Sequence, residues 1–200
     1  YQLSDITVLI TGYQGDSTEV KIPSKIHGFT VVGISEEAFS GRDDVTKVTL
    51  PDTIISIRAG AFKNTALYKN PKNWKDGSLY VSNALIAVKP SQVKGSYKVK
   101  AGTTCIADSA FANCTNLKEI IIPKSVKGIS SKAFYGCKKL EKVQISQNLK
   151  YVGEKVFEGT AYYKNSKNWK NNALYLNNCL VQANNKKVKG NYKVKKGTTY

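Results

Sequence analysis

The segment spanning residues 110–145 reads AFANCTNLKEIIIPKSVKGISSKAFYGCKKLEKVQI and contains one pattern twice. Phe111 and Phe134 each follow an alanine and lie 23 residues apart. Each precedes an apolar stretch of the form Leu-x-x-Ile-x-Ile or Leu-x-x-Val-x-Ile. A unit of this size cannot bury its apolar side chains alone, whereas stacked copies bury a continuous core. The segment therefore predicts a solenoid built from turns of 23 residues.

The phenylalanines extend this repeat along most of the chain. Five of the six occupy the same place in the unit, and they are Phe39, Phe62, Phe111, Phe134 and Phe157. Such large apolar side chains at a fixed spacing are typical of core positions. We expect all five side chains in the core, with Phe134 stacked on Phe111 and Phe157 as an aromatic ladder.

The apolar stretch of each unit predicts a parallel strand, because alternate side chains of a strand point to opposite faces. Leu117, Ile120 and Ile122 should face the core, while Glu119 and Ile121 face outward. Across three units the outward positions form two columns: Lys47, Glu119 and Lys142, then Thr49, Ile121 and Gln144. Solenoids bind partners on such extended faces. These six residues are the candidate binding site.

A longer module separates some of the turns and occurs twice. Residues 65–104 and 160–199 are identical at 23 of 40 positions, at an offset of 95 residues. The chain is therefore predicted to be one domain, residues 1–200, duplicated internally over about 10–104 and 105–199. The fold class is a β-rich, right-handed solenoid of roughly eight turns with inserted β-hairpin modules and short helical pieces before each Ala-Phe pair. The array should continue past Tyr200.

Each long module contains a predicted hairpin and one tryptophan. In the first copy, LYVSNALIAV alternates around Ser82-Asn83, and GSYKVKAGTT predicts a further short strand. Trp74 and Trp169 lie just before the hairpins. They either cover the root of the hairpin, which their identical contexts favour, or stack on sugar rings.

The motifs IPSKIHGFTVVGISEEAFSG (residues 22–41) and VTKVTLPDTIISIRAGAF (residues 45–62), with the segment quoted first, resemble the BspA-like (treponemal-type) leucine-rich repeat. The resemblance covers nearly the whole chain. It implies a bacterial protein that is secreted or displayed at the cell surface and that adheres to host-matrix or neighbouring-cell proteins. It implies no catalytic residues, and we expect no enzymatic activity.

The charge of the chain suggests a different class of partner. The formal net charge is +17, and of the 31 basic residues only Arg42 and Arg58 are arginine. A basic strip lies near the end of the chain at Lys186, Lys187, Lys189, Lys193, Lys195 and Lys196. The alternative function is therefore binding of an anionic polymer through the lysine-rich C-terminal half, either a cell-wall polymer or glycosaminoglycan or, as a less favoured choice, nucleic acid. Sequence-specific binding of nucleic acid is not expected, because it usually recruits arginine.

Few residues could support other chemistry. His27 is the only histidine and is expected in an exposed turn. The four cysteines, Cys105, Cys114, Cys137 and Cys179, form no Cys-x-x-Cys pair, so we expect neither metal nor cofactor. Cys114 and Cys137 are predicted to be free buried thiols, with a disulfide between them as the alternative. No apolar run approaches the ~18 residues of a membrane span, so membrane insertion is not expected.

Overall fold

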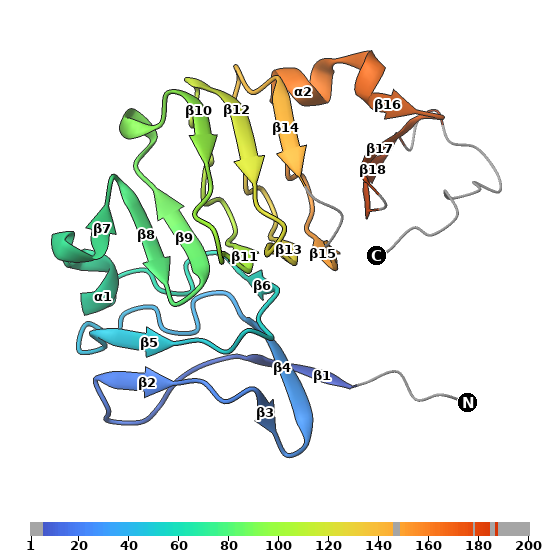
Figure 1. Cartoon of the computed structure of the whole chain (residues 1–200). Helices are drawn as coiled ribbons and strands as arrows, with labels where there is room; N and C mark the ends of the chain where they lie inside the picture. Colours follow the sequence, from blue (N-terminus) through green and yellow to red (C-terminus); the bar gives the residue numbers. More distant parts are fainter. Residues whose placement is uncertain (1–5, 146–148, 178, 185–186, 188–200) are drawn as a thin grey trace, which may run out of the picture.

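The computed structural model describes residues 6–145, 149–177, 179–184 and 187, and it shows a β-rich solenoid (Figure 1). The N-terminal strands are β1 (Thr7–Ile10), β2 (Glu19–Lys21), β3 (Lys25–Ile26), β4 (Phe29–Ile34), β5 (Lys47–Thr49) and β6 (Ser56–Ile57). The first long module forms α1 (Ala66–Lys69), η1 (Pro71–Asn73), β7 (Trp74–Lys75), β8 (Ser78–Val81), β9 (Ala84–Val88), η2 (Pro90–Gln92) and β10 (Gly95–Lys98).

The C-terminal part repeats this order. Its elements are β11 (Cys105–Ile106), β12 (Leu117–Ile122), β13 (Gly128–Ile129), β14 (Lys142–Ile145), β15 (Tyr151–Val152), α2 (Ala161–Lys164), η3 (Ser166–Asn168), β16 (Trp169–Lys170), β17 (Ala173–Leu176) and β18 (Cys179–Ala183). Successive turns pair in parallel, as in the sheets β10–β12–β14 and β11–β13–β15. The predicted alternation along β12 is confirmed, because Leu117, Ile120 and Ile122 are buried and Glu119 and Ile121 are only partly so.

The phenylalanine stack is confirmed. All five rings are at most 2% exposed. Phe39 and Phe62 stack with ring centroids 5.4 Å apart, and the centroids of Phe111, Phe134 and Phe157 follow one another at 5.1 and 5.4 Å. This spacing is close to the ~4.8 Å between neighbouring strands, so one ring fits each turn.

The stack is interrupted once, between Phe62 and Phe111. The hairpin of β8 and β9 lies between these turns, and its strands pair antiparallel. The residues of β9 enter two different cores: Ala84 and Ile86 pack with the N-terminal cluster, and Leu85 and Val88 pack with the C-terminal one. The hairpin therefore separates two hydrophobic cores.

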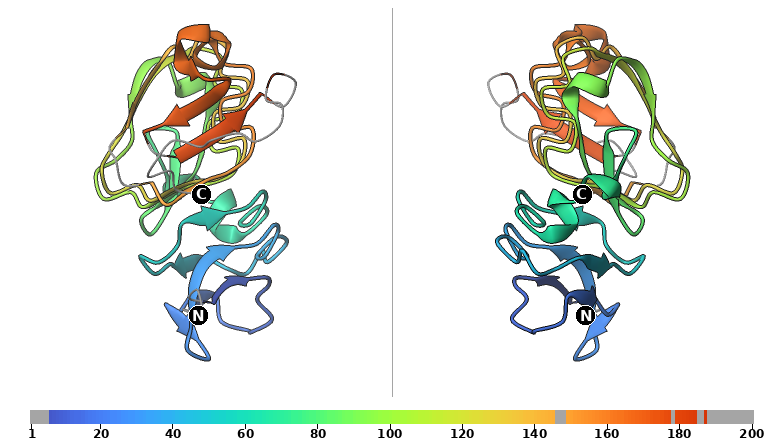
Figure 2. Two further views of the ribbon diagram at one scale, coloured as in Figure 1. Left: turned by 90° about the vertical axis from the view of Figure 1, so that its right-hand side faces the viewer. Right: turned by 90° about the vertical axis from the view of Figure 1, so that its left-hand side faces the viewer.

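The direction of the solenoid changes at this hairpin. In Figure 1, β2 and β5 run across the view, whereas β10, β12 and β14 run down it. Figure 2 looks along the C-terminal turns, whose traces overlie one another, while the N-terminal turns lie one above the next. The parallel strands of the chain thus form two separate faces.

The long modules correct two expectations. Their hairpins are antiparallel and do not wind as turns, so roughly eight turns is too high a number. The helical pieces α1 and α2 lie inside these modules, after the Ala-Phe pair of residues 61–62 and the Val-Phe pair of residues 156–157 rather than before them. The hairpin predicted at Ser82-Asn83 is confirmed, with Ser82 at a φ of 50°.

The N-terminal and C-terminal parts of the chain approach each other closely at Gly128. A Cβ atom built on Gly128 would overlap the backbone carbonyl oxygen of Ile55, which lies just before β6. Nearby, the amide of Ile57 donates to Ser130 Oγ at 3.0 Å, and the amide of Asp108 donates to the carbonyl of Ile57 at 2.9 Å. The turn at residues 52–58 is therefore fastened to the C-terminal stack by contacts far apart in sequence.

Replacement of Phe134 by alanine should lower the free energy of unfolding by about 3–5 kcal/mol, because it leaves a cavity between two stacked rings. The neighbouring Tyr135, which is 38% exposed, provides the control, and Tyr135→Ala should change stability by no more than about 0.5 kcal/mol. Urea denaturation followed by circular dichroism measures both. Equal losses of unfolding free energy in the two variants would contradict the interpretation that the phenylalanine stack is the main stabilising contact.

Gly128→Ala should destabilise the protein by about 2 kcal/mol or more, since the new methyl group must displace backbone rather than a flexible side chain. Gly12→Ala is the matched control, because a Cβ atom there has nothing within 4 Å. Thermal unfolding checks the pair. Near-identical melting temperatures of the two variants would mean that the backbone at the junction of the N-terminal and C-terminal parts shifts at little cost in free energy.

Candidate functional site

Four of the six predicted binding residues lie together on one face. In the register of β12 and β14, Glu119 is opposite Lys142 and Ile121 is opposite Gln144. The side-chain amide of Gln144 donates to Glu119 Oε1 at 2.7 Å, which links the two columns. The outward positions of these strands therefore form one continuous polar surface around Ile121.

Strand β10 adds two residues that the sequence analysis did not place on this face. Ser96 is paired in register with Glu119, and Lys98 with Ile121. The predicted strand in GSYKVKAGTT is thus confirmed, but its alignment with β12 is set by tertiary packing. Ile121 lies half-buried between Lys98 on one neighbouring strand and Gln144 on the other. We call residues 96, 98, 119, 121, 142 and 144 the β10–β12–β14 face.

Lys47 and Thr49 lie on a different face. Their strand, β5, pairs with β2, which places Lys47 beside Glu19 and Thr49 beside Lys21. Lys47 Nζ and Glu19 Oε2 are 3.0 Å apart in an ion pair that is largely exposed, so it contributes little stability. The expectation of two columns running through all three units is therefore wrong, because the hairpin turns the solenoid between β5 and β10.

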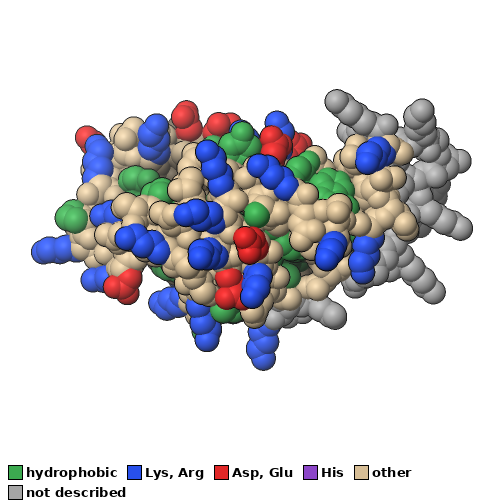
Figure 3. All heavy atoms as spheres, turned by 90° about the horizontal axis from the view of Figure 1, so that it is seen from above, with side chains coloured by type: hydrophobic (Ala, Val, Ile, Leu, Met, Phe, Trp, Pro, Cys, Tyr) green, Lys and Arg blue, Asp and Glu red, His purple; other side chains and the backbone are tan. Residues whose placement is uncertain are grey.

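The predicted basic strip lies mostly outside the described residues. Lys186, Lys189, Lys193, Lys195 and Lys196 belong to the part that the structure does not describe, while Lys187 is exposed. Viewed from above, Figure 3 shows lysine and arginine side chains scattered over the surface with acidic side chains between them. The described surface in this view carries no single basic patch.

The two tryptophans have structural contacts. Trp74 Nε1 donates to the carbonyl of Tyr68 at 2.9 Å, and Trp169 Nε1 donates to that of Tyr163 at 2.7 Å. Each indole also packs edge-on against the same tyrosine, with centroids 5.3 and 5.1 Å apart. These bonds fasten α1 to β7 and α2 to β16, and they support the interpretation that the tryptophans cover the hairpin root.

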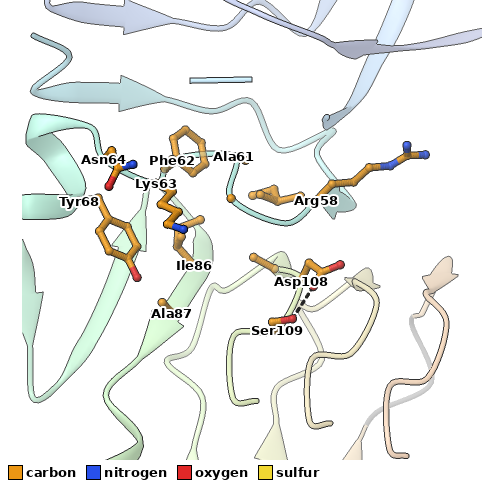
Figure 4. A pocket seen from close by; sticks show the side chains of 13 residues that line it. Arg58, Ala61, Phe62, Lys63, Asn64, Tyr68, Ile86, Ala87, Asp108 and Ser109 are labelled. Carbon is orange, nitrogen blue, oxygen red and sulfur yellow. Dashed lines mark hydrogen bonds between the residues drawn. The ribbon is translucent and has the colours of Figure 1, made fainter. Parts of the chain in front are cut away.

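A cavity of about 300 Å³ lies where the phenylalanine stack is interrupted (Figure 4). Phe62, Tyr68 and Ile86 supply much of its apolar lining. Arg58 extends away from these rings, and Asp108 accepts a hydrogen bond from the Ser109 hydroxyl at 2.6 Å. The backbone amides of Phe39 and Gly41 donate hydrogen bonds to the next Ala-Phe turn. This series of bonds ends at the cavity, because the carbonyl of Ala110 accepts a hydrogen bond from Val88 of the hairpin. The cavity thus lies where the backbone contact between successive turns is missing.

Among the residues that the structure describes, the titratable side chains do not come together as a reactive group. His27 is exposed in a turn with a φ of 49°, as predicted. Within the described ranges, no three His, Cys, Asp or Glu residues lie close enough to hold a metal ion. Asp44 accepts two hydrogen bonds from Arg42, which lower the pKa of its carboxyl group, and Arg42 also donates to the carbonyl of Tyr13. Arg42 therefore fixes the N-terminal loop.

The four cysteines are free thiols in the core, which confirms the prediction for Cys114 and Cys137. Cys137 Sγ donates to the carbonyl of Phe111 at 3.0 Å. Burial raises the pKa of Cys105 to about 12, and a hydrogen bond with Cys114 together with burial raises that of Cys137. A thiol with a raised pKa keeps its proton at neutral pH and is a poor nucleophile.

In native buffer at pH 8, an aromatic disulfide reagent should react with fewer than one of the four thiols over minutes. In guanidinium chloride all four should react, because unfolding restores both access and an ordinary pKa. The absorbance of the released thiolate counts them. Two thiols that react only after reduction would instead indicate a disulfide.

The described residues contain no helix with the length and apolar character needed to cross a membrane. No curated protein matches the chain.

Solved structures of similar sequence are bacterial leucine-rich repeat proteins. The leucine-rich repeat protein of T. pallidum is 24% identical, with 77% of this chain and 81% of that chain covered and a TM-score of 0.37. A leucine-rich cell surface protein of Faecalibacterium prausnitzii is 23% identical (78% and 49% covered, TM-score 0.34), and a leucine-rich repeat protein of Bacteroides ovatus is 20% identical (80% and 55% covered, TM-score 0.31). The chain spans about half the length of the latter two.

The sequence model described as the BspA type leucine-rich repeat region matches residues 13–73 and 95–199, in six copies. Its matches leave out residues 74–94, which hold the hairpin that interrupts the stack. Six copies replace the roughly eight turns expected. The chain belongs to the family of BspA-type leucine-rich repeat proteins.

Proposed function

We propose that the protein is a non-catalytic interaction module that binds a protein of the host matrix or of a neighbouring cell through the β10–β12–β14 face. The observation that carries this is Ile121, a partly exposed isoleucine at the centre of an ordered, otherwise polar sheet surface. An apolar residue surrounded by a polar rim is typical of the centre of a protein interface.

The composition of the face favours a protein over a polyanion. It carries Lys98 and Lys142 against Glu119, and the other members are uncharged. A surface that binds polyanions concentrates positive charge, and this face has only a small excess of positive charge. The parallel pairing of three strands also fixes the backbone, so that binding would order few groups beyond the side chains.

Secretion or display on a bacterial surface is part of the proposal and rests on the family. The proposed module is non-catalytic, and the surroundings of the side chains suited to catalysis support this: His27 stands in an exposed turn, and the four thiols are buried, with the pKa raised for Cys105 and Cys137. Binding of an anionic polymer through the lysines of residues 186–196 stays a prediction from the sequence.

Ile121→Lys should weaken binding to a protein partner at least tenfold, since it places a charge at the centre of the contact. Thr49→Lys is the matched control: it adds the same charge at an outward position of β5, on the other face. Surface plasmon resonance against immobilised extracellular-matrix proteins measures both, with the wild-type chain first identifying a binder.

The double variant Lys186→Ala with Lys187→Ala tests the alternative. For a protein partner it should change affinity less than twofold, and raising the salt concentration should have a modest effect. If this variant loses binding, if Ile121→Lys does not, and if high salt abolishes the signal, the partner is a polyanion and the proposed face is wrong.

A further inference from the structure

A second recess lies beside the β10–β12–β14 face, between the β7–β8 hairpin and β10. Its volume is about 540 Å³. Four lysines and two tyrosines dominate the lining, and they are Lys72, Lys75, Lys98, Lys100, Tyr80 and Tyr97. We call this recess the lysine–tyrosine cleft. It lies within the described residues and is distinct from the basic strip predicted near the C-terminus.

The hairpin that forms one wall is fixed by its turn. Asp76 and Gly77 connect β7 to β8 with φ angles of 47° and 69°, the left-handed values that a two-residue hairpin turn needs. The Asp-Gly pair is the strongest short-range hairpin signal in the sequence, although the sequence analysis located only the turn at Ser82-Asn83. This turn holds Lys75 at the edge of the cleft.

The tyrosines give the cleft a rigid, partly apolar floor. The Tyr97 ring packs edge-on against Phe111, with centroids 5.0 Å apart, and its hydroxyl lies 2.7 Å from Ser78 Oγ. Burial raises the pKa of Tyr97 to about 12, so this hydroxyl is neutral at physiological pH. The Tyr80 hydroxyl accepts a hydrogen bond from the Lys100 amide at 3.3 Å, which ties β8 to the end of β10.

The ammonium groups have few anionic neighbours. All four lysines are exposed, and none of them forms an ion pair with a carboxylate among the residues that the structure describes. Lys100 Nζ instead lies 5.8 Å from the centroid of the Tyr80 ring. Asp76 is the one acidic residue of the lining. Like charges gathered at one recess repel each other, and a bound anion would relieve that repulsion.

The second long module keeps the same residue types. At an offset of 95 residues the four lysines and two tyrosines recur as Lys167, Lys170, Lys193, Lys195, Tyr175 and Tyr192. With Asn73, seven of the nine lining positions are identical in the two copies, against 23 of 40 along the whole module. The two that differ are Asp76 and Ser78, replaced by Asn171 and Ala173, so the second copy loses the acidic residue.

We propose that the lysine–tyrosine cleft binds a sugar unit that carries an anionic group, namely a carboxylate, sulfate or phosphate. Lysine ammonium groups are compact charges that suit such groups, and the flat ring of Tyr80 offers an apolar surface for the C–H face of a sugar. The Tyr97 and Ser78 hydroxyls supply neutral hydrogen-bonding groups beside the charges. The site is independent of the proposed protein contact, apart from Lys98, which belongs to both surfaces.

Isothermal titration with a heparin-derived hexasaccharide tests the proposal. Lys75→Gln combined with Lys100→Gln should lower the affinity at least tenfold, and this pair leaves Lys98 and the β10–β12–β14 face intact. Lys138→Gln combined with Lys150→Gln is the control; both lysines are exposed outside the cleft, and the net charge changes equally. The control should lose less than twofold. Equal losses in the two variants would overturn the site.

A measurement on the unaltered protein guards against variants that fail to fold. In ¹⁵N-correlated spectra, the hexasaccharide should shift amide signals of residues 72–80 and 95–100 and leave those of β2 and β5 unchanged. Shifts spread over all exposed lysine-bearing segments, or confined to residues outside the cleft, would overturn the proposal.

Further ligands distinguish recognition of a sugar from recognition of charge alone, and they distinguish the possible sources of the sugar. Neutral maltohexaose should not bind measurably, and inorganic polyphosphate or a single-stranded DNA of equal charge should bind at least tenfold more weakly than the hexasaccharide. Glucosylated poly(glycerol phosphate) represents a bacterial wall polymer, and its affinity relative to the hexasaccharide indicates which source supplies the ligand. If polyphosphate or DNA binds as tightly as both sugars, the cleft recognises charge alone and the sugar assignment is wrong.

Discussion

The stacking of one phenylalanine on the next constrains every other part of the protein. The rings repeat at 5.1–5.4 Å, close to the spacing of the paired strands, so each turn must bring its ring and its strand into register together. This fixes the length of the turn and the apolar positions of its strand. The outward positions take no part in the stack, and they differ freely: Glu119 in one turn is followed by Lys142 in the next.

The interruption of the stack generates most of the surface features of the molecule. Where the β8–β9 hairpin replaces a turn, the axis changes direction, the apolar cavity at Phe62 remains, and β10 begins a new parallel sheet. The same module brings Lys75 and Lys100 to one recess. The regular repeat supplies rigidity, and the irregular module supplies the features that distinguish this surface from that of a uniform solenoid.

Much of the fold could be predicted because its determinants are local. The period placed the five phenylalanines, the alternation placed Leu117, Ile120 and Ile122 inward, and the equivalent positions of Cys114 and Cys137 indicated buried thiols. The arrangement of the faces could not be predicted in this way. It depends on contacts between distant segments, such as the approach of Ile55 to Gly128, so Lys47 was assigned to the wrong surface and Lys98 was not assigned to the face. The cleft was missed because its lysines come from separate elements.

The division of the interior by β9 has a mechanical consequence. Because Ile86 of β9 belongs to one core and Leu85 to the other, and Cys105 of β11 is divided from Ile106 in the same way, the two stacks share β9 and β11 as their common wall, with a cavity beside it. In a repeat protein each unit contacts only its neighbours, so cohesion is weakest where neighbouring contacts are fewest. Under a pulling force across the two stacks, this wall and the bonds that join Ile57 to Ser130 and Asp108 would part before either stack unravels. The C-terminal stack and its outward face would then remain intact while the chain lengthens under load.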